Sequence, residues 1–392
     1  MIYPRIILPQ LEQELHSKEN IVITGMRQVG KTTLLKHLFS LVQSENKILL
    51  DFENPLNRKI FESEDYDAIW NNLSPLGITN SKKAYIFLDE VQHLKSIGSV
   101  AKYLSDHWEV KFFLTGSSSY YLKNFFPESM SGRKFIFEVY PLTFGEFLLF
   151  KGVKREEITS FSKKAASKNY ISHQKLLPYY LEYLEYGGFP KVVLLDSVDR
   201  KKKMLADIFT SYFEVDIQSL SDFKESSKLR DLILLLIPRV GSRIEIVKLS
   251  QSLGVSRETV YSYLSFLEDT YFISLLSKFS DSIDRQAAGM QKLYLCDSGM
   301  VNFLGKASEG QLLEQTVFQN LHPTHNLNFY NKGGGEIDFI VDEKVALEVK
   351  TSVSRRDISN LNKRIESLDI NEGYVVTKEY SQEKEAILVT DL

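Results

Sequence analysis

The stretch from Gly25 to Thr32 constrains this chain more than any other. It reads Gly-Met-Arg-Gln-Val-Gly-Lys-Thr and has the G-x-x-x-x-G-K-[ST] spacing of a phosphate-binding P-loop. An apolar, strand-like segment (20–24) precedes it, and a segment with helical apolar spacing (33–39) follows it. A glycine-rich turn that contains Lys-Thr by chance is the alternative. The strand–loop–helix context favours the P-loop, because it places backbone N–H groups and a helix N-terminus around an anion.

This motif predicts a nucleotide site with ATP and Mg²⁺ as its ligands. Lys31 is expected to reach the β- and γ-phosphates and Thr32 to bind Mg²⁺. The residues expected to surround the nucleotide are Gly25, Met26, Arg27, Gln28, Val29, Gly30, Lys31, Thr32 and Thr33.

Length and composition favour a globular protein of several domains. The chain has 392 residues, a net charge of -3 and a single cysteine, Cys296. One cysteine excludes an internal disulfide and a cysteine-based metal site. The aliphatic runs are too short for a membrane span, and no signal-peptide pattern begins the sequence. We therefore expect a cytoplasmic protein without a membrane partner, whose contacts with nucleic acid would depend on local basic patches.

The pattern that follows the P-loop predicts an α/β fold with a parallel sheet. Strand-like segments occur at 47–52, 84–88 and 110–115, with helical patterns between them, such as 100–108. Strands that alternate with helices indicate βαβ units, and continuous apolar strands suit a sheet that is covered on both faces.

Polar residues at the ends of two of these strands are candidates for catalysis. Asp89 follows an apolar strand and is the expected Walker B carboxylate, which holds Mg²⁺. Glu90 is expected to polarise the water that attacks the γ-phosphate. Ser117 and Ser118 follow the next strand and are candidates for positioning that water, although serine is also common in ordinary loops.

Arg133 is a candidate for neutralising charge that develops in the transition state. It follows Ser131-Gly132, and an arginine finger accelerates phosphoryl transfer by roughly 10³–10⁵. The sequence leaves open whether Arg133 acts within its own chain, acts on a neighbouring copy, or only ends a strand.

Taken together, the ordered motifs resemble a family of bacterial and archaeal AAA-type ATPases related to the origin-recognition and STAND ATPases. The resemblance covers nearly the whole chain. Its motifs are Gly25–Thr32, Leu88–Gln92, Leu114–Ser118, Ser131–Arg133, Pro141–Phe147 and Tyr186–Pro190. It implies an AAA-like core, a winged helix and a C-terminal nuclease-like domain.

A helix-turn-helix pattern lies in the region 226–280. The turn Ser252–Ser256 contains a glycine and separates two short helical segments, and Ser256 is the expected N-cap of the second. In that second helix, Val260, Leu264 and Leu267 should face inward. The residues expected to face outward are Arg257, Glu258, Tyr261, Ser262 and Ser265. The region predicts either a DNA-binding surface or a helical domain used for protein packing.

The C-terminal region contains the PD-(D/E)xK pattern of restriction-endonuclease-like folds. Asp338 lies on one expected strand, and Glu348 and Lys350 share one face of the next. By resemblance, Asp338 and Glu348 would bind a second divalent metal, Lys350 would orient water or stabilise charge, and Glu314 on a preceding helix would assist. The alternative is a polar hairpin without activity, since a nuclease fold does not guarantee cleavage.

We therefore predict an ATPase core over 1–150, a helical lid over 151–225, a winged helix over 226–280 and a nuclease-like domain over 285–392. The predicted function is Mg²⁺-dependent ATP hydrolysis that is coupled to DNA-type modules. Three alternatives remain: an ATP-controlled DNA nuclease, a nucleotide-switched DNA-binding protein with an inert nuclease-like domain, and a signalling scaffold that forms homo-oligomers in response to nucleotide.

Overall fold

The chain divides into two compact units, which we describe separately. The computed structural model describes residues 3–117, 133–156, 158–217, 226–280, 290–332, 335–366, 368 and 370–392. The first unit comprises Met1–Tyr140 with Asp269–Tyr271, and the second comprises Pro141–Glu268 with Phe272–Leu392. None of the helices in these described ranges is long and apolar enough to cross a membrane.

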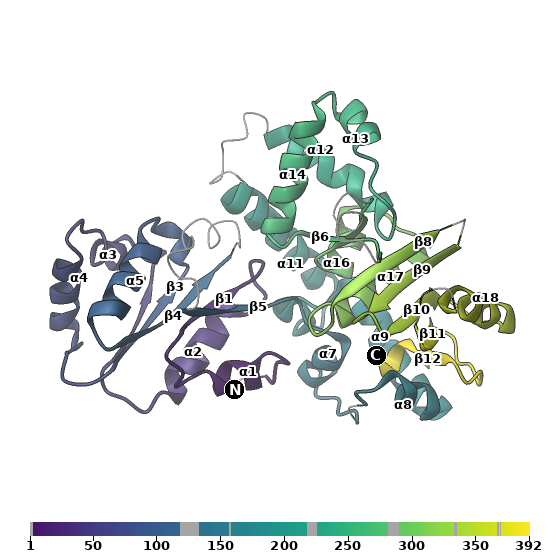
Figure 1. Cartoon of the computed structure of the whole chain (residues 1–392), viewed down its shortest axis with the longest axis horizontal. Coiled ribbons are helices and arrows are strands. Elements are labelled where there is room, and N and C mark those ends of the chain that lie inside the picture. The colour runs from purple at the N-terminus through teal and green to yellow at the C-terminus, as the bar shows by residue number, and fades with distance from the viewer. Residues whose placement is uncertain are drawn as a thin grey trace. The chain divides into compact units, whose positions relative to one another are not determined.

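The first unit is built on the parallel sheet that the sequence predicts (Figure 1). Its five strands lie in the order β2-β3-β4-β1-β5, and every neighbouring pair is parallel. Their bounds are β1 (Asn20–Thr24), β2 (Lys47–Asp51), β3 (Ala84–Asp89), β4 (Val110–Gly116) and β5 (Lys134–Glu138). The helices are α1 (Leu8–Gln13), α2 (Lys31–Leu41), α3 (Pro55–Lys59), α4 (Tyr66–Leu73) and α5 (Ile97–His107).

Both faces of this sheet are covered, as the apolar strands require. On one face, Ile86 and Phe112 pack with residues of α4 and α5, including Trp70. On the other face, Phe87 stacks on Phe113 and meets Phe39 of α2 edge to face. Because successive side chains of a strand point to opposite faces of the sheet, each strand contributes side chains to both cores. β1 and β4 are buried along their whole length, which places their ends in the middle of the sheet edge.

The second unit begins with a helical part. Its helices are α7 (Phe144–Phe150), α8 (Phe161–Ala166), α9 (Tyr170–Tyr186), α10 (Pro190–Val193) and α11 (Val198–Ser211), followed by a π-helical turn (Tyr212–Ile217). In the division into units, α7 groups with the second unit. The reason lies in its N-terminal turn, where the Leu142 N–H donates to the Gly188 carbonyl at 2.8 Å and the Phe144 N–H donates to Asn320.

The Gly187-Gly188 turn is fixed by a buried carboxylate. A Cβ on Gly187 would lie 1.8 Å from Asp297 Oδ1, and a Cβ on Gly188 would lie 2.3 Å from the Leu142 carbonyl oxygen. Asp297 accepts the Gly188 N–H at 2.6 Å and a side-chain amide hydrogen of Gln319 at 2.9 Å. Two separate sequence motifs, around 142 and 187, therefore meet at one buried acid.

A three-helix segment and a hairpin follow. They comprise α12 (Ser226–Leu236), α13 (Ile246–Leu253), α14 (Arg257–Asp269), β6 (Ile273–Leu276) and β7 (Lys292–Leu295), with β6 and β7 antiparallel. Gly254 ends α13 in the left-handed region, with φ +66°, as the expected turn requires. On α14 the expected inward residues are buried and the expected outward residues are exposed.

The C-terminal part contains a mixed sheet in the order β12-β11-β10-β9-β8. Its elements are α16 (Ser298–Leu304), α17 (Glu309–Leu321), β8 (Leu327–Lys332), β9 (Gly335–Val341), β10 (Val345–Lys350), α18 (Arg355–Ile365), β11 (Glu372–Thr377) and β12 (Ala386–Leu388). The hairpin β9–β10 forms as predicted, with Asp342 and Glu343 at positive φ in its turn. The pairs β10–β11 and β11–β12 are parallel.

Asp297 makes a testable contribution to stability. Burial raises its pKa from 3.8 to about 6, although hydrogen bonds from Gly188, Gln319, Met300 and Gly299 oppose the shift. The folded chain therefore binds an extra proton between these two pH values. The stabilisation from this group is complete below about pH 4 and is lost as the pH rises through 6, by about 1.4 kcal/mol per pKa unit.

We expect the Asp297→Asn variant to lose this dependence. Urea unfolding of both proteins between pH 4 and 7 measures it. As the pH rises, the free energy of unfolding of the wild type should fall relative to that of Asp297→Asn. The same dependence of the unfolding free energy on pH in both proteins would contradict the prediction.

Candidate functional site

The P-loop leaves the sheet at the carboxyl end of β1. Gly25 has φ +145°, and a Cβ at this position would lie 2.1 Å from the Val139 carbonyl oxygen. A side chain at this position would push the loop away from Val139, which directly follows β5. Gln28 and Gly30 also have positive φ, and α2 begins directly at Lys31. The loop therefore wraps tightly in front of a helix N-terminus, which is a favourable place for a phosphate.

Lys31 turns back over this loop and is nearly buried. Its Nζ donates to the carbonyl oxygens of Gly25 and Met26, each at 2.9 Å. The ammonium therefore lies at the beginning of the loop, among backbone groups.

Two buried polar atoms beside the loop lack a partner within the described residues. They are Thr24 Oγ1 and Gln28 Oε1. An unpaired buried polar atom costs free energy, roughly 1–3 kcal/mol, so such atoms mark places where a ligand or its water shell can bind. With the glycine cradle and the Lys31 ammonium, they fit a polyphosphate with Mg²⁺.

Arg5 braces the P-loop from the N-terminal segment. Its Nη1 donates to the Val29 carbonyl at 2.8 Å, and its Nη2 donates to the Tyr140 carbonyl at 2.8 Å. Sequence reasoning missed this residue. A lone Pro-Arg near the N-terminus carries no motif, and the contact joins positions far apart in the chain.

Asp89 lies at the carboxyl end of β3 and is 5% exposed. Burial raises its pKa, while hydrogen bonds from the hydroxyls of Thr115 and Thr32 work in the opposite direction. The two residues predicted to bind Mg²⁺, Thr32 and Asp89, are therefore in contact. Thr115, which sequence reasoning missed, donates its hydroxyl to Asp89 Oδ1.

Glu90 occupies a left-handed backbone position, with φ 54°. This conformation is uncommon for a residue with a side chain and persists only where the surroundings hold it. Here the Glu90 N–H donates to Thr115 Oγ1 at 3.1 Å, so one hydroxyl connects Asp89 and Glu90.

Ser117 and Gln92 complete the group around Glu90. The Gln92 amide donates to Glu90 Oε2 and, at 3.1 Å, to Ser117 Oγ. The oxygen of that amide, Gln92 Oε1, is buried without a partner in the described residues. Sequence reasoning selected Ser117 but missed Gln92, whose position was visible only as part of a motif. Ser118 lies outside the described residues.

The strand order brings these groups to one edge. β4 lies between β1 and β3, and all three are parallel. Their carboxyl ends carry the P-loop, Asp89 and Ser117. The arrangement joins a phosphate cradle, a buried carboxylate and an adjacent carboxylate held by Gln92, as phosphoryl transfer to water requires.

Arg133 lies at the opposite end of the sheet. Its carbonyl accepts the Asn20 N–H at 2.9 Å at the beginning of β1, and its guanidinium pairs with Asp106 of α5. The P-loop begins at the other end of β1. Because β1 and β5 run in parallel, a full strand separates Arg133 from the loop, and the alternative in which Arg133 acts within its own nucleotide site is excluded for this structure.

The C-terminal tetrad is brought together, but with additional partners. Glu314 of α17 and Asp338 of β9 both contact Lys292 of β7, and Glu348 of β10 pairs with Arg364 of α18. Lys350 Nζ lies 3.7 Å from Glu348 Oε2. Within the described ranges, no group of three or more His, Cys, Asp or Glu side chains is arranged to hold a metal ion. The arrangement therefore does not fit the second divalent metal that the sequence pattern implied.

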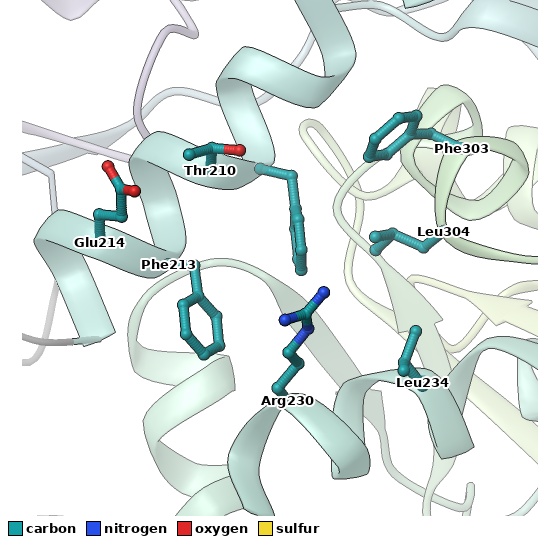
Figure 2. A pocket seen from close by; sticks show the side chains of 8 residues that line it. Thr210, Phe213, Glu214, Arg230, Leu234, Phe303 and Leu304 are labelled. Carbon is teal, nitrogen blue, oxygen red and sulfur yellow. The ribbon is translucent and has the colours of Figure 1, made fainter. Parts of the chain in front are cut away.

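A separate cavity of about 420 Å³ lies in the second unit (Figure 2). Arg230 points into it between aromatic rings. Its lining residues are Phe209, Thr210, Phe213, Glu214, Arg230, Leu234, Phe303 and Leu304. It contains none of the residues that the motifs selected.

The Thr115 hydroxyl provides a test of this geometry. We expect Thr115→Val, which keeps the shape of the side chain, to lower the free energy of unfolding of the first unit by about 1–3 kcal/mol, because the Glu90 N–H loses its acceptor and Asp89 loses a donor. Thr115→Ser keeps the hydroxyl and should remain close to the wild type. Urea unfolding measures both, and equal stability of the valine variant would contradict this role.

Comparisons with known proteins agree with the geometry of the first unit. Residues 17–148 match the family model AAA_14, described as an AAA domain. Residues 177–311 and 309–390 match two further models, each described as a domain of unknown function.

Relatives with similar sequences extend over most of the chain. An uncharacterized protein of Methanocaldococcus jannaschii is 29% identical over 408 residues, which cover 99% of this chain and 88% of that protein. A Walker-type ATPase of Pyrococcus abyssi is 14% identical, and its structure covers 77% of this chain and 96% of its own with a TM-score of 0.44. The ADP form of the Aeropyrum pernix ORC2 protein is 13% identical and covers 70% of this chain and 88% of its own with a TM-score of 0.34. Over residues 17–148 the chain is thus similar to AAA domains.

Proposed function

We propose that the first unit binds and hydrolyses ATP. The observation that carries this proposal is the meeting of Thr32, Asp89 and Thr115 at one edge of the sheet, directly beside the P-loop. The AAA match over 17–148 supports the same conclusion independently.

Residues of the loop would hold the phosphates. The backbone from Gly25 to Thr33 would surround them, and Lys31 would exchange its carbonyl partners for phosphate oxygens. Thr32 and Asp89 would hold Mg²⁺, which in such sites neutralises charge on the phosphates. The contact between these two side chains supports the assignment.

Glu90 would act as the general base. Its carboxylate is held by Gln92, and Gln92 in turn contacts Ser117, so both side chains can orient the attacking water beside Glu90. Because the backbone at Glu90 is left-handed, its side chain would point in another direction than the side chain of Asp89. Asp89 could then bind the metal while Glu90 binds the water.

As an arginine finger, Arg133 would act on the nucleotide of a neighbouring copy. Arg133 lies away from its own P-loop, so its participation implies a nucleotide-dependent homo-oligomer. Within one chain its guanidinium has a structural partner in Asp106.

Two substitutions test the ATPase proposal. We expect Lys31→Ala to weaken ATP binding by roughly 10- to 100-fold, because a charge-assisted contact contributes about 1.5–3 kcal/mol. We expect Glu90→Gln to bind ATP as the wild type does while its kcat falls by about 10²- to 10⁴-fold. Fluorescent ATP titration and phosphate release measure the two effects, and unchanged turnover in Lys31→Ala would exclude the site.

The second unit provides a candidate for what ATP hydrolysis controls. We take α12, α13 and α14 with the antiparallel pair β6–β7 as the proposed winged helix. The exposed face of α14 carries Arg257, Tyr261, Ser262 and Ser265. This face supports duplex DNA as the partner whose binding is coupled to ATP hydrolysis. Glu258 on the same face and the net charge of -3 limit the electrostatic attraction.

DNA binding through α14 predicts a specific loss. We expect Tyr261→Ala, which removes an exposed side chain, to weaken duplex binding by about tenfold without changing thermal stability. Leu234→Ala, at another exposed apolar position of this unit, is the matched control. Fluorescence anisotropy with labelled duplex measures both, and an absence of salt-sensitive binding in the wild type would favour the scaffold alternative.

A further inference from the structure

Lys292 is a buried cation that the sequence motifs did not select. It lies on β7, its side chain is 1% exposed, and its Nζ is 2.8 Å from Glu314 Oε1, 2.8 Å from Glu336 Oε1 and 3.2 Å from Asp338 Oδ1. Although burial opposes it, the carboxylates of Asp338, Glu314 and Glu336 raise the pKa of Lys292. The ammonium is therefore charged; it donates to Glu314 and Asp338 and forms an ion pair with Glu336.

Neighbouring strands and helix α17 place their side chains around this ammonium. Glu336 and Asp338 are two residues apart on β9 and so share one face. Tyr294 is likewise two residues after Lys292 on β7, and its hydroxyl donates to Glu314 Oε1 at 2.6 Å. The second oxygen of Asp338 accepts the Val349 N–H at 2.9 Å. Glu314 and Asp338 are thus oriented by groups besides the lysine.

The remaining acid of the tetrad also has cationic partners of its own. Glu348 pairs with the Arg364 guanidinium, and Lys350 lies on its other oxygen. Arg364 also donates to the Glu336 carbonyl at 2.9 Å, which fixes it over the β9–β10 hairpin. The carboxylates of the nuclease-like pattern therefore have protein cations as neighbours.

A divalent ion could not share this space. Mg²⁺ and Ca²⁺ require carboxylate oxygens at about 2.0–2.6 Å around one point, and Lys292 Nζ already lies at that point. A second positive charge within a few ångströms of a buried ammonium would be strongly repelled in a medium of low dielectric constant. A buried carboxylate that loses its cationic partner is costly, so Lys292 and the acids around it depend on one another.

We propose that Lys292 is the resident cation of the Glu314–Glu336–Asp338 cluster, which includes Asp338, one of the two acids that the pattern assigns to a metal, so that this cluster binds no divalent ion. The cluster instead joins the β6–β7 hairpin to α17 and β9 by charge. This inference does not depend on ATP hydrolysis, because it concerns the second unit alone.

Binding of Mn²⁺ to the full-length protein without nucleotide tests the proposal. Electron paramagnetic resonance counts bound Mn²⁺ for the wild type, Lys292→Met, Lys292→Arg and the double variant Lys292→Met with Asp338→Asn. We expect neither the wild type nor Lys292→Arg, which keeps the charge, to show saturable Mn²⁺ binding that depends on Asp338. Lys292→Met should gain such a site, with an affinity at least about tenfold above any Asp338-dependent binding by the wild type, and the double variant should lose that gain.

Several outcomes would overturn the inference. Saturable Mn²⁺ binding by the wild type that Asp338→Asn abolishes would do so at once, and so would a folded Lys292→Met that gains no Mn²⁺. If Lys292→Met does not fold, Lys292→Gln replaces it, because its amide can still donate to Glu314, and the same criteria apply. Circular dichroism establishes folding, and Lys31→Ala turnover decides the ATPase proposal separately.

Discussion

The first unit depends on one buried carboxylate and the two hydroxyls that meet it. Asp89 brings Thr32 from the beginning of α2 and Thr115 from the end of β4 to the end of its own strand. The contact is possible only because β4 lies between β1 and β3 in a parallel sheet, so that three carboxyl ends coincide. The positive φ of Glu90 and the brace from Arg5 then fix the groups on either side.

The second unit is held by a different buried acid. Asp297 accepts hydrogen bonds at the Gly187-Gly188 turn, where a side chain on either glycine would clash. Through this turn the N-terminal segment of α7, the end of α9 and the beginning of α16 share one core. The two glycines are needed because the backbone and a carboxylate approach each other too closely for a Cβ.

The acids of the C-terminal pattern lie together but have cationic partners. Asp338, Glu348 and Lys350 occupy the neighbouring strands that the pattern predicts, and Glu314 lies on the helix that precedes them. Lys292 and Arg364 add positive charge at the carboxylates, which form a network of ion pairs. A network of this kind contributes orientation and specificity of packing rather than Lewis-acid chemistry.

The sequence by itself determined the local features. The P-loop, the order of strands and helices in the first unit, the turn at Gly254 and the β9–β10 hairpin follow from glycine placement, apolar periodicity and strand alternation, which act over a few residues. The tertiary structure alone decided that Thr115 binds Asp89, that Arg5 supports the loop, that Arg133 lies at the far end of β1, and that Lys292 fills the acidic cluster. These contacts join residues that are distant in the chain. Their charges and hydroxyls become partners only when strand order and burial place them together, and no spacing in the sequence encodes that proximity.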